Sequence, residues 1–266
     1  MKVCLVNGIK QNHIDIESRG LAYGDGLFTT AKIVNGEIQF LPKHIERLIA
    51  GCIKLKISPP SVADLENQLT PIAKNYSLAV LKIIISAKSG GRGYKRSIEN
   101  SHDVIVMIYD FPLNIEYKRE KGISLGVSRQ RIGISPMLSG LKHLNRLEQV
   151  LLTEELTHSD FEELLVMNIN NDVIEVTSAN VFFIINNEIY TPDISHSGVN
   201  GIMRQVILNK YTDIIVKSIS LEEIEKAQSI FICNCVMGII PISQYNDCRL
   251  SLELPLELSA QLQREV

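Results

Sequence analysis

One lysine stands where the sequence changes from a loop to a helix. Lys142 follows Pro136 and Gly140, which favour a loop. It precedes apolar residues that recur at steps of three and four between Leu144 and Leu151, a spacing that predicts a helix directly after the lysine. A lysine amine that has lost its proton forms Schiff bases with carbonyl compounds. Because most lysines near a helix start are solvated surface residues, the position of Lys142 alone does not show whether it is a reactive lysine or an ordinary surface lysine.

A glycine-containing loop, Gly198–Gly201, leads into a second predicted helix at residues 202–211. The amides at a helix N-terminus have no partner within the helix, and together with the helix dipole they bind anions. The alternative interpretation is a simple left-handed turn before an ordinary capped helix. No lysine follows at the spacing of a Walker loop, so that class of nucleotide site is excluded.

Two charged side chains lie within apolar patterns. Glu175 is surrounded by the apolar residues of the predicted strand 173–176, so it faces either solvent or a specific cation. Arg47 lies on a predicted amphipathic helix that begins at Pro42 and ends near Leu55. A surface ion pair with the adjacent Glu46 is the alternative to an anion-binding role for this arginine.

A third arginine lies in a glycine loop, where Arg92 is flanked by Gly91 and Gly93 and followed by Tyr94. Glycines allow the backbone to approach a ligand closely, and a guanidinium offers a forked pair of donors to a carboxylate. The alternative is a flexible surface loop.

The elements that must position these residues are short strands, tight turns and a few helices. Asn7-Gly8, Asn35-Gly36 and Asn186-Asn187 predict hairpin turns. Further predicted helices cover residues 61–76, 221–227 and the stretch from about 252. Predicted strands cover 3–6, 9–16, 27–34, 37–40, 79–86, 104–109, 123–127, 164–168, 181–185, 188–191, 229–234 and 236–241. Residues 19–26, with three glycines, predict a tight bend.

This order of elements predicts an α/β fold of α+β character. Strands do not alternate regularly with helices, so a doubly wound parallel sheet is not expected. The charged, proline-containing stretch 112–121 is expected to link an N-terminal domain (1–111) to a C-terminal, cofactor-binding domain (122–266).

The composition is that of an ordinary soluble enzyme. The 266 residues are 45% hydrophobic and carry a net charge of −3 without blocks of like charge, so neither nucleic acid nor an anionic membrane is an expected partner. No signal peptide or membrane span is predicted. The five cysteines are scattered without zinc-site spacing. They are expected to be reduced thiols in a cytoplasmic protein without a metal.

Three motifs, Lys142–Asn145, Glu175–Val181 and Asn200–Arg204, occur in the order and spacing of the fold-type IV pyridoxal-phosphate enzymes, the class IV aminotransferase family. The chain resembles this family from Tyr23 to Pro241. The resemblance implies pyridoxal 5′-phosphate as cofactor. It also implies two α/β domains with mainly antiparallel or mixed sheets and the cofactor at their interface.

The resemblance assigns roles residue by residue. Lys142 corresponds to the lysine that holds the cofactor covalently and later moves a proton. Glu175 corresponds to the acid that keeps the pyridine nitrogen protonated, so that the ring withdraws electrons. Arg47 corresponds to the arginine that pairs with the phosphate. The other implied cofactor contacts are Asn180, Val199 on the ring face, the amides of Ile202 and Met203 at the phosphate, and Asn234 and Cys235, where the family often has hydroxyl residues.

On the substrate side, the chain is most similar to the aminodeoxychorismate lyase branch of the family. The aminotransferases usually carry a glutamate where this chain has Thr29 and Thr30. The resemblance implies that Arg92 and Tyr94 bind the substrate carboxylate, in their own subunit or in the neighbouring subunit of a homodimer. One of the two threonines is expected to assist at the substrate ring.

The implied activity is conversion of 4-amino-4-deoxychorismate, a small-molecule substrate, to 4-aminobenzoate and pyruvate in folate biosynthesis. A D-amino acid or branched-chain aminotransferase would need the same cofactor residues and is the alternative. A non-catalytic binding relative is a second alternative, but it would not need Lys142, Glu175 and Arg47 together.

Overall fold

The computed structural model describes residues 1–99 and 101–263, which form two compact units. The first unit contains residues 1–112 and the short segment Leu141–Asn145. The second contains Leu113–Gly140 and the chain from Arg146 onward. The stretch expected to link the domains contains helix α4 (Ile115–Lys121), which belongs to the second unit.

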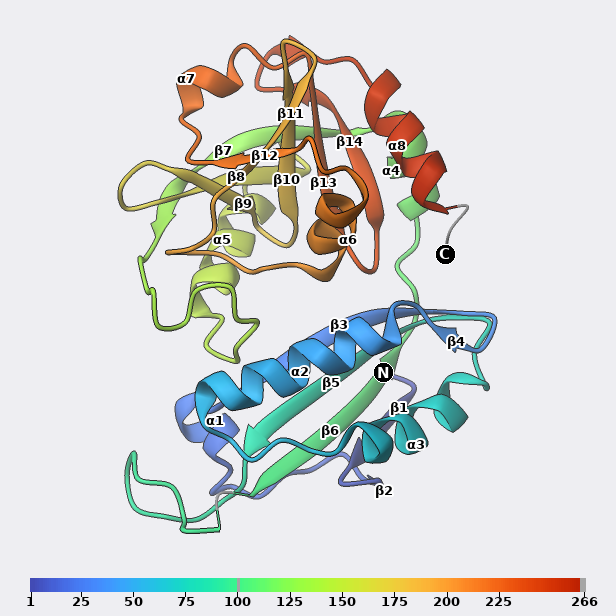
Figure 1. The fold of residues 1–266 in the computed structure, drawn as a ribbon, viewed down its shortest axis with the longest axis vertical. Coiled ribbons are helices and arrows are strands. Elements are labelled where there is room, and N and C mark those ends of the chain that lie inside the picture. Colours follow the sequence, from blue (N-terminus) through green and yellow to red (C-terminus); the bar gives the residue numbers. More distant parts are fainter. Residues whose placement is uncertain (100, 264–266) are drawn as a thin grey trace. The chain divides into compact units, whose positions relative to one another are not determined.

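The first unit is built on an antiparallel sheet of six strands in the order β2-β1-β6-β5-β3-β4 (Figure 1). The strands are β1 (Val3–Val6), β2 (Ile9–Lys10), β3 (Gly26–Val34), β4 (Glu37–Ile38), β5 (Leu78–Ala87) and β6 (His102–Tyr109). Asn7-Gly8 and Asn35-Gly36 are the turns of two hairpins, and all four residues have positive φ angles. This left-handed geometry matches the twist of the strands, and both predicted hairpins are confirmed.

Helices α2 (Leu41–Leu55) and α3 (Val62–Ala73) cover one face of this sheet, and both predicted helices are confirmed. Alternate residues of β3, β5 and β6 point into a single core with Ile45 and Leu48 of α2 and Leu65 of α3. The residues between them point to the opposite face, because side chains alternate along a strand. Strand β3 therefore carries two sets of side chains with different surroundings.

A short helix, α1 (Arg19–Tyr23), occupies the stretch predicted as a tight bend. It ends at Gly24, whose φ of 61° lies in the left-handed region. Because glycine has no Cβ, it takes this conformation without strain and ends the helix at Tyr23, two residues before Asp25.

The second unit contains a mixed sheet of nine strands in the order β12-β11-β10-β13-β14-β7-β8-β9, with β15 paired to β14. The strands are β7 (Ile123–Ile132), β8 (Glu163–Asn168), β9 (Val173–Val176), β10 (Asn180–Ile185), β11 (Glu188–Pro192), β12 (Ile215–Lys217), β13 (Ser229–Asn234), β14 (Gly238–Tyr245) and β15 (Cys248–Arg249). The β11–β12, β14–β7 and β7–β8 pairs are parallel and the others are antiparallel. The predicted mixed α/β fold class is thus confirmed.

Four further helices accompany α4 in this unit: α5 (Leu147–Thr157), α6 (Ile202–Lys210), α7 (Leu221–Ile224) and α8 (Glu253–Gln263). Ser220 caps α7 in a capping box with Glu223, as its predicted position at the helix start indicates. Strands β8, β9 and β10 are buried along their whole length, and the stacked rings of Phe182 and Phe231 lie 4.7 Å apart within the core. No helix among the described residues is long and apolar enough to cross a bilayer.

Candidate active site

Lys142 lies on an extended segment that pairs with the first residues of β3. The Phe28 amide donates a hydrogen bond to the Lys142 carbonyl oxygen at 2.8 Å, and the Leu144 amide donates to the Gly26 carbonyl oxygen at 3.0 Å. Helix α5 begins only at Leu147, so the prediction that a helix follows Lys142 directly is wrong. The backbone groups around Lys142 are engaged with a strand and do not form a first helical turn.

The glycines before β3 make room for this segment. A Cβ on Gly24 would overlap the side chain of Asn145, whose Nδ2 donates to the Gly24 carbonyl oxygen at 3.1 Å. A Cβ on Gly26 would lie 2.8 Å from Cδ1 of Leu144 and would also collide with the backbone of β5. The glycines predicted to form a bend are therefore required by the packing of the lysine segment.

The amine of Lys142 lies over an aromatic ring. Its Nζ is 4.7 Å from the centre of the Phe28 ring, and Nζ of Lys82 is 5.0 Å from the same centre. Both distances are typical of a cation–π contact. Lys82 pairs with Thr30 across β3 and β5, so Phe28, Thr30 and Lys82 share the sheet face that carries the amine. Sequence reasoning missed Lys82, although a lysine within the apolar run of β5 was a signal.

Arg47 lies near the other face of β3. Its Nη2 donates to Oγ1 of Thr29, and Nδ1 of His44 lies 2.6 Å from the same hydroxyl. Thr29 and His44 are fully buried. Burial, reinforced by the charge of Arg47, lowers the pKa of His44 from 6.5 to about 3. Of the two threonines expected at the substrate ring, Thr30 shares the face of Lys142, whereas Thr29 contacts Arg47. His44 was missed by sequence reasoning.

Arg92 and Tyr94 lie in an exposed loop. The amide and carbonyl groups of Arg92 and Lys95 exchange hydrogen bonds of 3.1 and 3.2 Å, which closes a tight turn. Arg19 donates to the carbonyl oxygens of Gly93 at 3.0 Å and Tyr94 at 3.1 Å, so the loop is tethered to α1.

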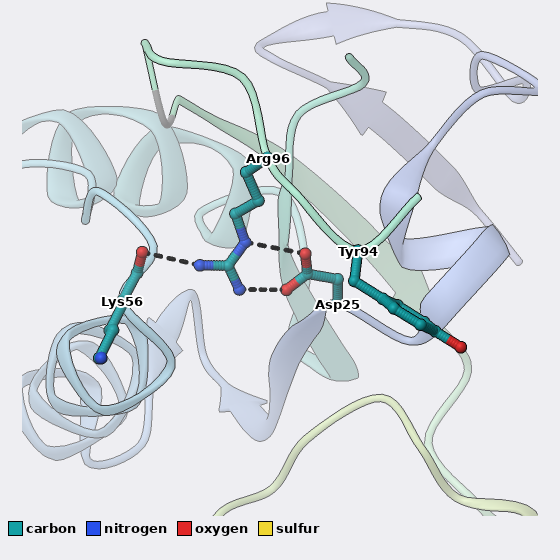
Figure 2. Close-up of a pocket in the computed structure, with 4 residues that line it drawn as sticks. All are labelled: Asp25, Lys56, Tyr94 and Arg96. Carbon is teal, nitrogen blue, oxygen red and sulfur yellow. Dashed lines mark hydrogen bonds and ion pairs between the residues drawn. The ribbon is translucent and has the colours of Figure 1, made fainter. Parts of the chain in front are cut away.

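Asp25, which lies within the predicted bend 19–26, anchors the other end of this loop. Arg96 donates to both of its carboxylate oxygens, through Nε at 2.9 Å and through Nη2 (Figure 2), and Nε of Arg19 donates at 2.9 Å. Burial alone raises the pKa of the Asp25 carboxyl, but these bonds outweigh it and the pKa lies below its ordinary value. Asp25, Lys56, Tyr94 and Arg96 line a hollow of about 370 Å³. Asp25 thereby joins the loop to the start of β3.

The second unit holds the candidate acid. Glu175 on β9 is only 6% exposed, which excludes the solvent-facing interpretation. Its Oε2 accepts a hydrogen bond from the Val199 amide at 3.0 Å. Burial lowers the pKa of the Arg146 guanidinium, and the charges of Glu175 and Glu148 oppose this shift. Glu175 therefore lies close enough to the Arg146 guanidinium for the two charges to interact.

The glycine loop before α6 brings the Val199 amide to this carboxylate, and Asn180 at the start of β10 holds the loop. Nδ2 of Asn180 donates to the Val199 carbonyl oxygen at 2.9 Å. Gly198 has a φ of 84°, and a Cβ there would lie 2.6 Å from Cγ2 of Ile174 and 3.2 Å from Oε2 of Glu175. The glycine is therefore needed for both its backbone conformation and its close approach to the acid.

Helix α6 begins directly after this loop without a side-chain cap. Gly201 is its N-cap residue and has no side chain that could accept a hydrogen bond from the first turn. The amides of Ile202 and Met203 belong to that first turn, although the side chains of both residues are buried. An uncapped N-terminus of a nine-residue helix supports the anion-binding interpretation of the loop.

Asn234 and Cys235 lie at the turn that follows β13. Oδ1 of Asn234 accepts from the amides of Val236 at 2.9 Å and Met237 at 2.8 Å, and its Nδ2 donates to the Ser178 carbonyl oxygen at 3.3 Å. Asn234 therefore shapes the turn with its own side chain. Cys235 is half-buried.

The groups present fit pyridoxal phosphate by their chemistry. The first unit contains a lysine amine and a guanidinium, and the second unit, described by itself, contains a buried carboxylate and uncapped helix amides. Such groups suit an aldehyde, a phosphate and a pyridine nitrogen. No cluster of three or more His, Cys, Asp or Glu side chains that could hold a metal occurs in the described part of the chain.

Comparison with known proteins identifies the family. The class IV aminotransferase family model matches residues 26–245. The chain belongs to this family. Class IV aminotransferases and their lyase relatives depend on pyridoxal phosphate, which confirms the predicted cofactor. The chain is 33% identical to an aminodeoxychorismate lyase of Vibrio harveyi over 97% of each chain.

Solved structures agree with this family assignment. A 4-amino-4-deoxychorismate lyase from Pseudomonas aeruginosa superposes with a TM-score of 0.94 at 31% identity over 99% of both chains, which confirms the predicted resemblance. A branched-chain amino acid aminotransferase from Escherichia coli superposes with a TM-score of 0.86 at 18% identity over 99% of this chain and 94% of that one, and shows the shared fold alone.

The buried imidazole predicts how stability depends on pH. Because the folded state holds His44 neutral to about pH 3 while the unfolded chain takes up a proton near pH 6.5, the stability from this neutral ring is complete above pH 6.5. It is lost as the pH falls from 6.5 toward 3, by about 1 kcal/mol per pH unit. The difference in unfolding free energy between the wild type and His44→Gln, measured in urea, should shrink steadily from pH 7 to pH 4. A constant difference would contradict the buried neutral histidine.

Proposed function

We propose that this chain is a pyridoxal-phosphate-dependent lyase that converts 4-amino-4-deoxychorismate to 4-aminobenzoate and pyruvate, a step of folate biosynthesis. The observation that carries the proposal is full-length similarity above 30% identity to lyases in both sequence and solved structure. A D-alanine aminotransferase of Bacillus licheniformis is 27% identical over 94% of the chain, so the aminotransferase alternative has weaker support.

The cofactor, when bound, supplies a carbonyl carbon that joins amines and a ring that withdraws electrons from the adjoining carbon. Lys142 would hold the cofactor, and its amine would take the proton from the amine-bearing carbon of the substrate. Glu175 keeps the pyridine nitrogen protonated from its buried position on β9. Arg47 and the amides of Ile202 and Met203 bind the phosphate.

Loss of that proton allows the bond between the neighbouring ring carbon and the enolpyruvyl oxygen to break, and the leaving enolate takes up one proton to become pyruvate. Aromatisation of the remaining ring to 4-aminobenzoate drives the reaction. Thr30 shares the sheet face of Lys142, and its hydroxyl assists at the substrate ring.

We further propose that Arg92 and Tyr94 bind the substrate carboxylate and that the enzyme is a homodimer. The exposed position of the loop, in which Tyr94 is 89% exposed, suits a contribution to the neighbouring subunit. Leu147, Val150 and Leu151 form an exposed apolar stripe on α5 at the spacing of one helix face, which suits a subunit contact. None of the five cysteines, all of which lie within the described residues, forms a disulfide, which supports a cytoplasmic location.

The substrate assignment is tested by supplying the same protein preparation with the substrates of the lyase reaction and, separately, of the aminotransferase reaction. The purified protein with cofactor should release 4-aminobenzoate and pyruvate from 4-amino-4-deoxychorismate. It should give less transfer of the amino group from D-alanine to a keto acid, because the chain is more similar to lyases than to aminotransferases. Faster turnover of D-alanine than of 4-amino-4-deoxychorismate would replace the lyase with the aminotransferase alternative.

The substrate role of the loop is tested by Arg92→Ala, with Lys95→Ala as the matched control from the same turn. Loss of a forked charged donor should lower kcat/KM of the lyase reaction about a hundredfold, while the absorbance spectrum of the bound cofactor stays normal. Lys95→Ala should leave both unchanged. Wild-type kinetics for Arg92→Ala would make the loop a surface turn, and a collapsed spectrum would assign Arg92 to the cofactor or the fold.

A further inference from the structure

Three side chains meet on the inner face of β3, away from the amine of Lys142. Thr29 stands between His44 and Arg47, which are three residues apart on α2 and therefore lie on one face of that helix. The threonine and the histidine have no exposed surface, so this contact is closed to a substrate.

The donors and acceptors of this group form a directed chain. A guanidinium only donates hydrogen bonds, so Arg47 donates to the Thr29 hydroxyl. That hydroxyl has one proton, and it donates this proton in a hydrogen bond to Nδ1 of His44 when the imidazole carries its own proton on Nε2. The pKa of His44, lowered to about 3 by burial, keeps the ring neutral and thus able to accept.

The remaining nitrogen of this ring shows that the arrangement has a cost. Nε2 of His44 is buried and has no hydrogen-bond partner among residues 1–99 and 101–263. A buried polar atom without a partner is unfavourable, and such an exception calls for an explanation. The hydrogen bond between His44 and Thr29 explains why a histidine occupies this position despite the unpartnered nitrogen.

We propose that Thr29 and His44 are positioning residues that fix the Arg47 guanidinium for the cofactor phosphate. This inference rests on the proposed role of Arg47 in the phosphate site. An arginine side chain loses considerable rotational freedom when it binds a ligand. A side chain that is already held in its bound orientation loses less, so it binds the phosphate more tightly. Thr29 and Thr30, adjacent in sequence, thus serve the cofactor and the substrate respectively.

The test compares two cofactor forms, pyridoxal 5′-phosphate and pyridoxal, which lacks the phosphate. Cofactor-free protein is titrated with each and followed by absorbance. Thr29→Val, which keeps the shape but removes the hydroxyl, should raise the dissociation constant for pyridoxal phosphate about tenfold. Affinity for pyridoxal should stay unchanged, because Arg47 has no phosphate to bind there. Thr29→Ser, which restores a hydroxyl, should bind both forms like the wild type.

His44→Phe provides a second variant if Thr29→Val fails to fold. It fills the same space but cannot accept the hydroxyl proton, and it should raise the dissociation constant for pyridoxal phosphate about threefold without affecting pyridoxal. An equal loss for both cofactor forms in either variant would make the group a structural element and overturn the inference.

A double-mutant cycle with Arg47 separates this inference from the proposal on which it rests. Arg47→Ala should raise the dissociation constant for pyridoxal phosphate about a hundredfold, and adding Thr29→Val to this variant should raise it no further. If Arg47→Ala weakens binding but Thr29→Val alone has no effect, or if the two losses are additive, the positioning role is wrong while the phosphate role stands. If Arg47→Ala binds pyridoxal phosphate like the wild type, the phosphate role itself is wrong and the inference is overturned with it.

Discussion

The backbone pairing between the start of β3 and the segment around Lys142 is the constraint on which the candidate site depends. Two hydrogen bonds, from Phe28 to Lys142 and from Leu144 to Gly26, hold the lysine to a strand of the sheet. A lysine placed in this way is oriented by the backbone on both sides and not by a flexible loop. The glycines at positions 24 and 26 are present because any side chain there would occupy the place of this segment.

The alternation of side chains along β3 then separates the chemistry onto two faces. Phe28 and Thr30 share one face with the amine of Lys142, whereas Thr29 points into the core toward Arg47. A period of two residues is enough to give adjacent threonines different neighbours. Substitutions at the two positions are therefore expected to change different quantities, which are cofactor affinity at position 29 and substrate turnover at position 30.

Much of the fold was predictable because it is determined locally. The Asn-Gly hairpins and helices α2 and α3 follow from turn residues and hydrophobic periodicity within short windows. Lys142, Glu175 and Arg47 were found as candidates because their types and motifs suggest chemistry. Their surroundings in the structure, namely a strand, a buried loop contact and a buried hydroxyl, suit those roles.

The missed features depend on contacts between residues far apart in the chain. The Asp25–Arg96 ion pair joins two loops, and Lys82 reaches the Phe28 ring only through the register of β3 and β5. The late start of α5 has the same origin. The leucine spacing indicated a helix in this region, but pairing with β3 keeps residues 142–144 extended, so the helix begins only at Leu147. The register of β5 against β3 and the pairing of residues 142–144 with β3 join segments far apart in the chain, so a short window of sequence does not determine them.

Lys82 is a natural competitor of Lys142 for the role of the lysine that holds the cofactor. Nζ of Lys82 is nearly as close to the Phe28 ring centre, at 5.0 Å against 4.7 Å for Lys142. Borohydride reduction of the cofactor-loaded protein, followed by digestion and mass spectrometry, identifies the lysine that becomes permanently modified. We expect the modification on Lys142 with Lys82 unmodified. Modification of Lys82 with Lys142 unmodified would contradict this expectation.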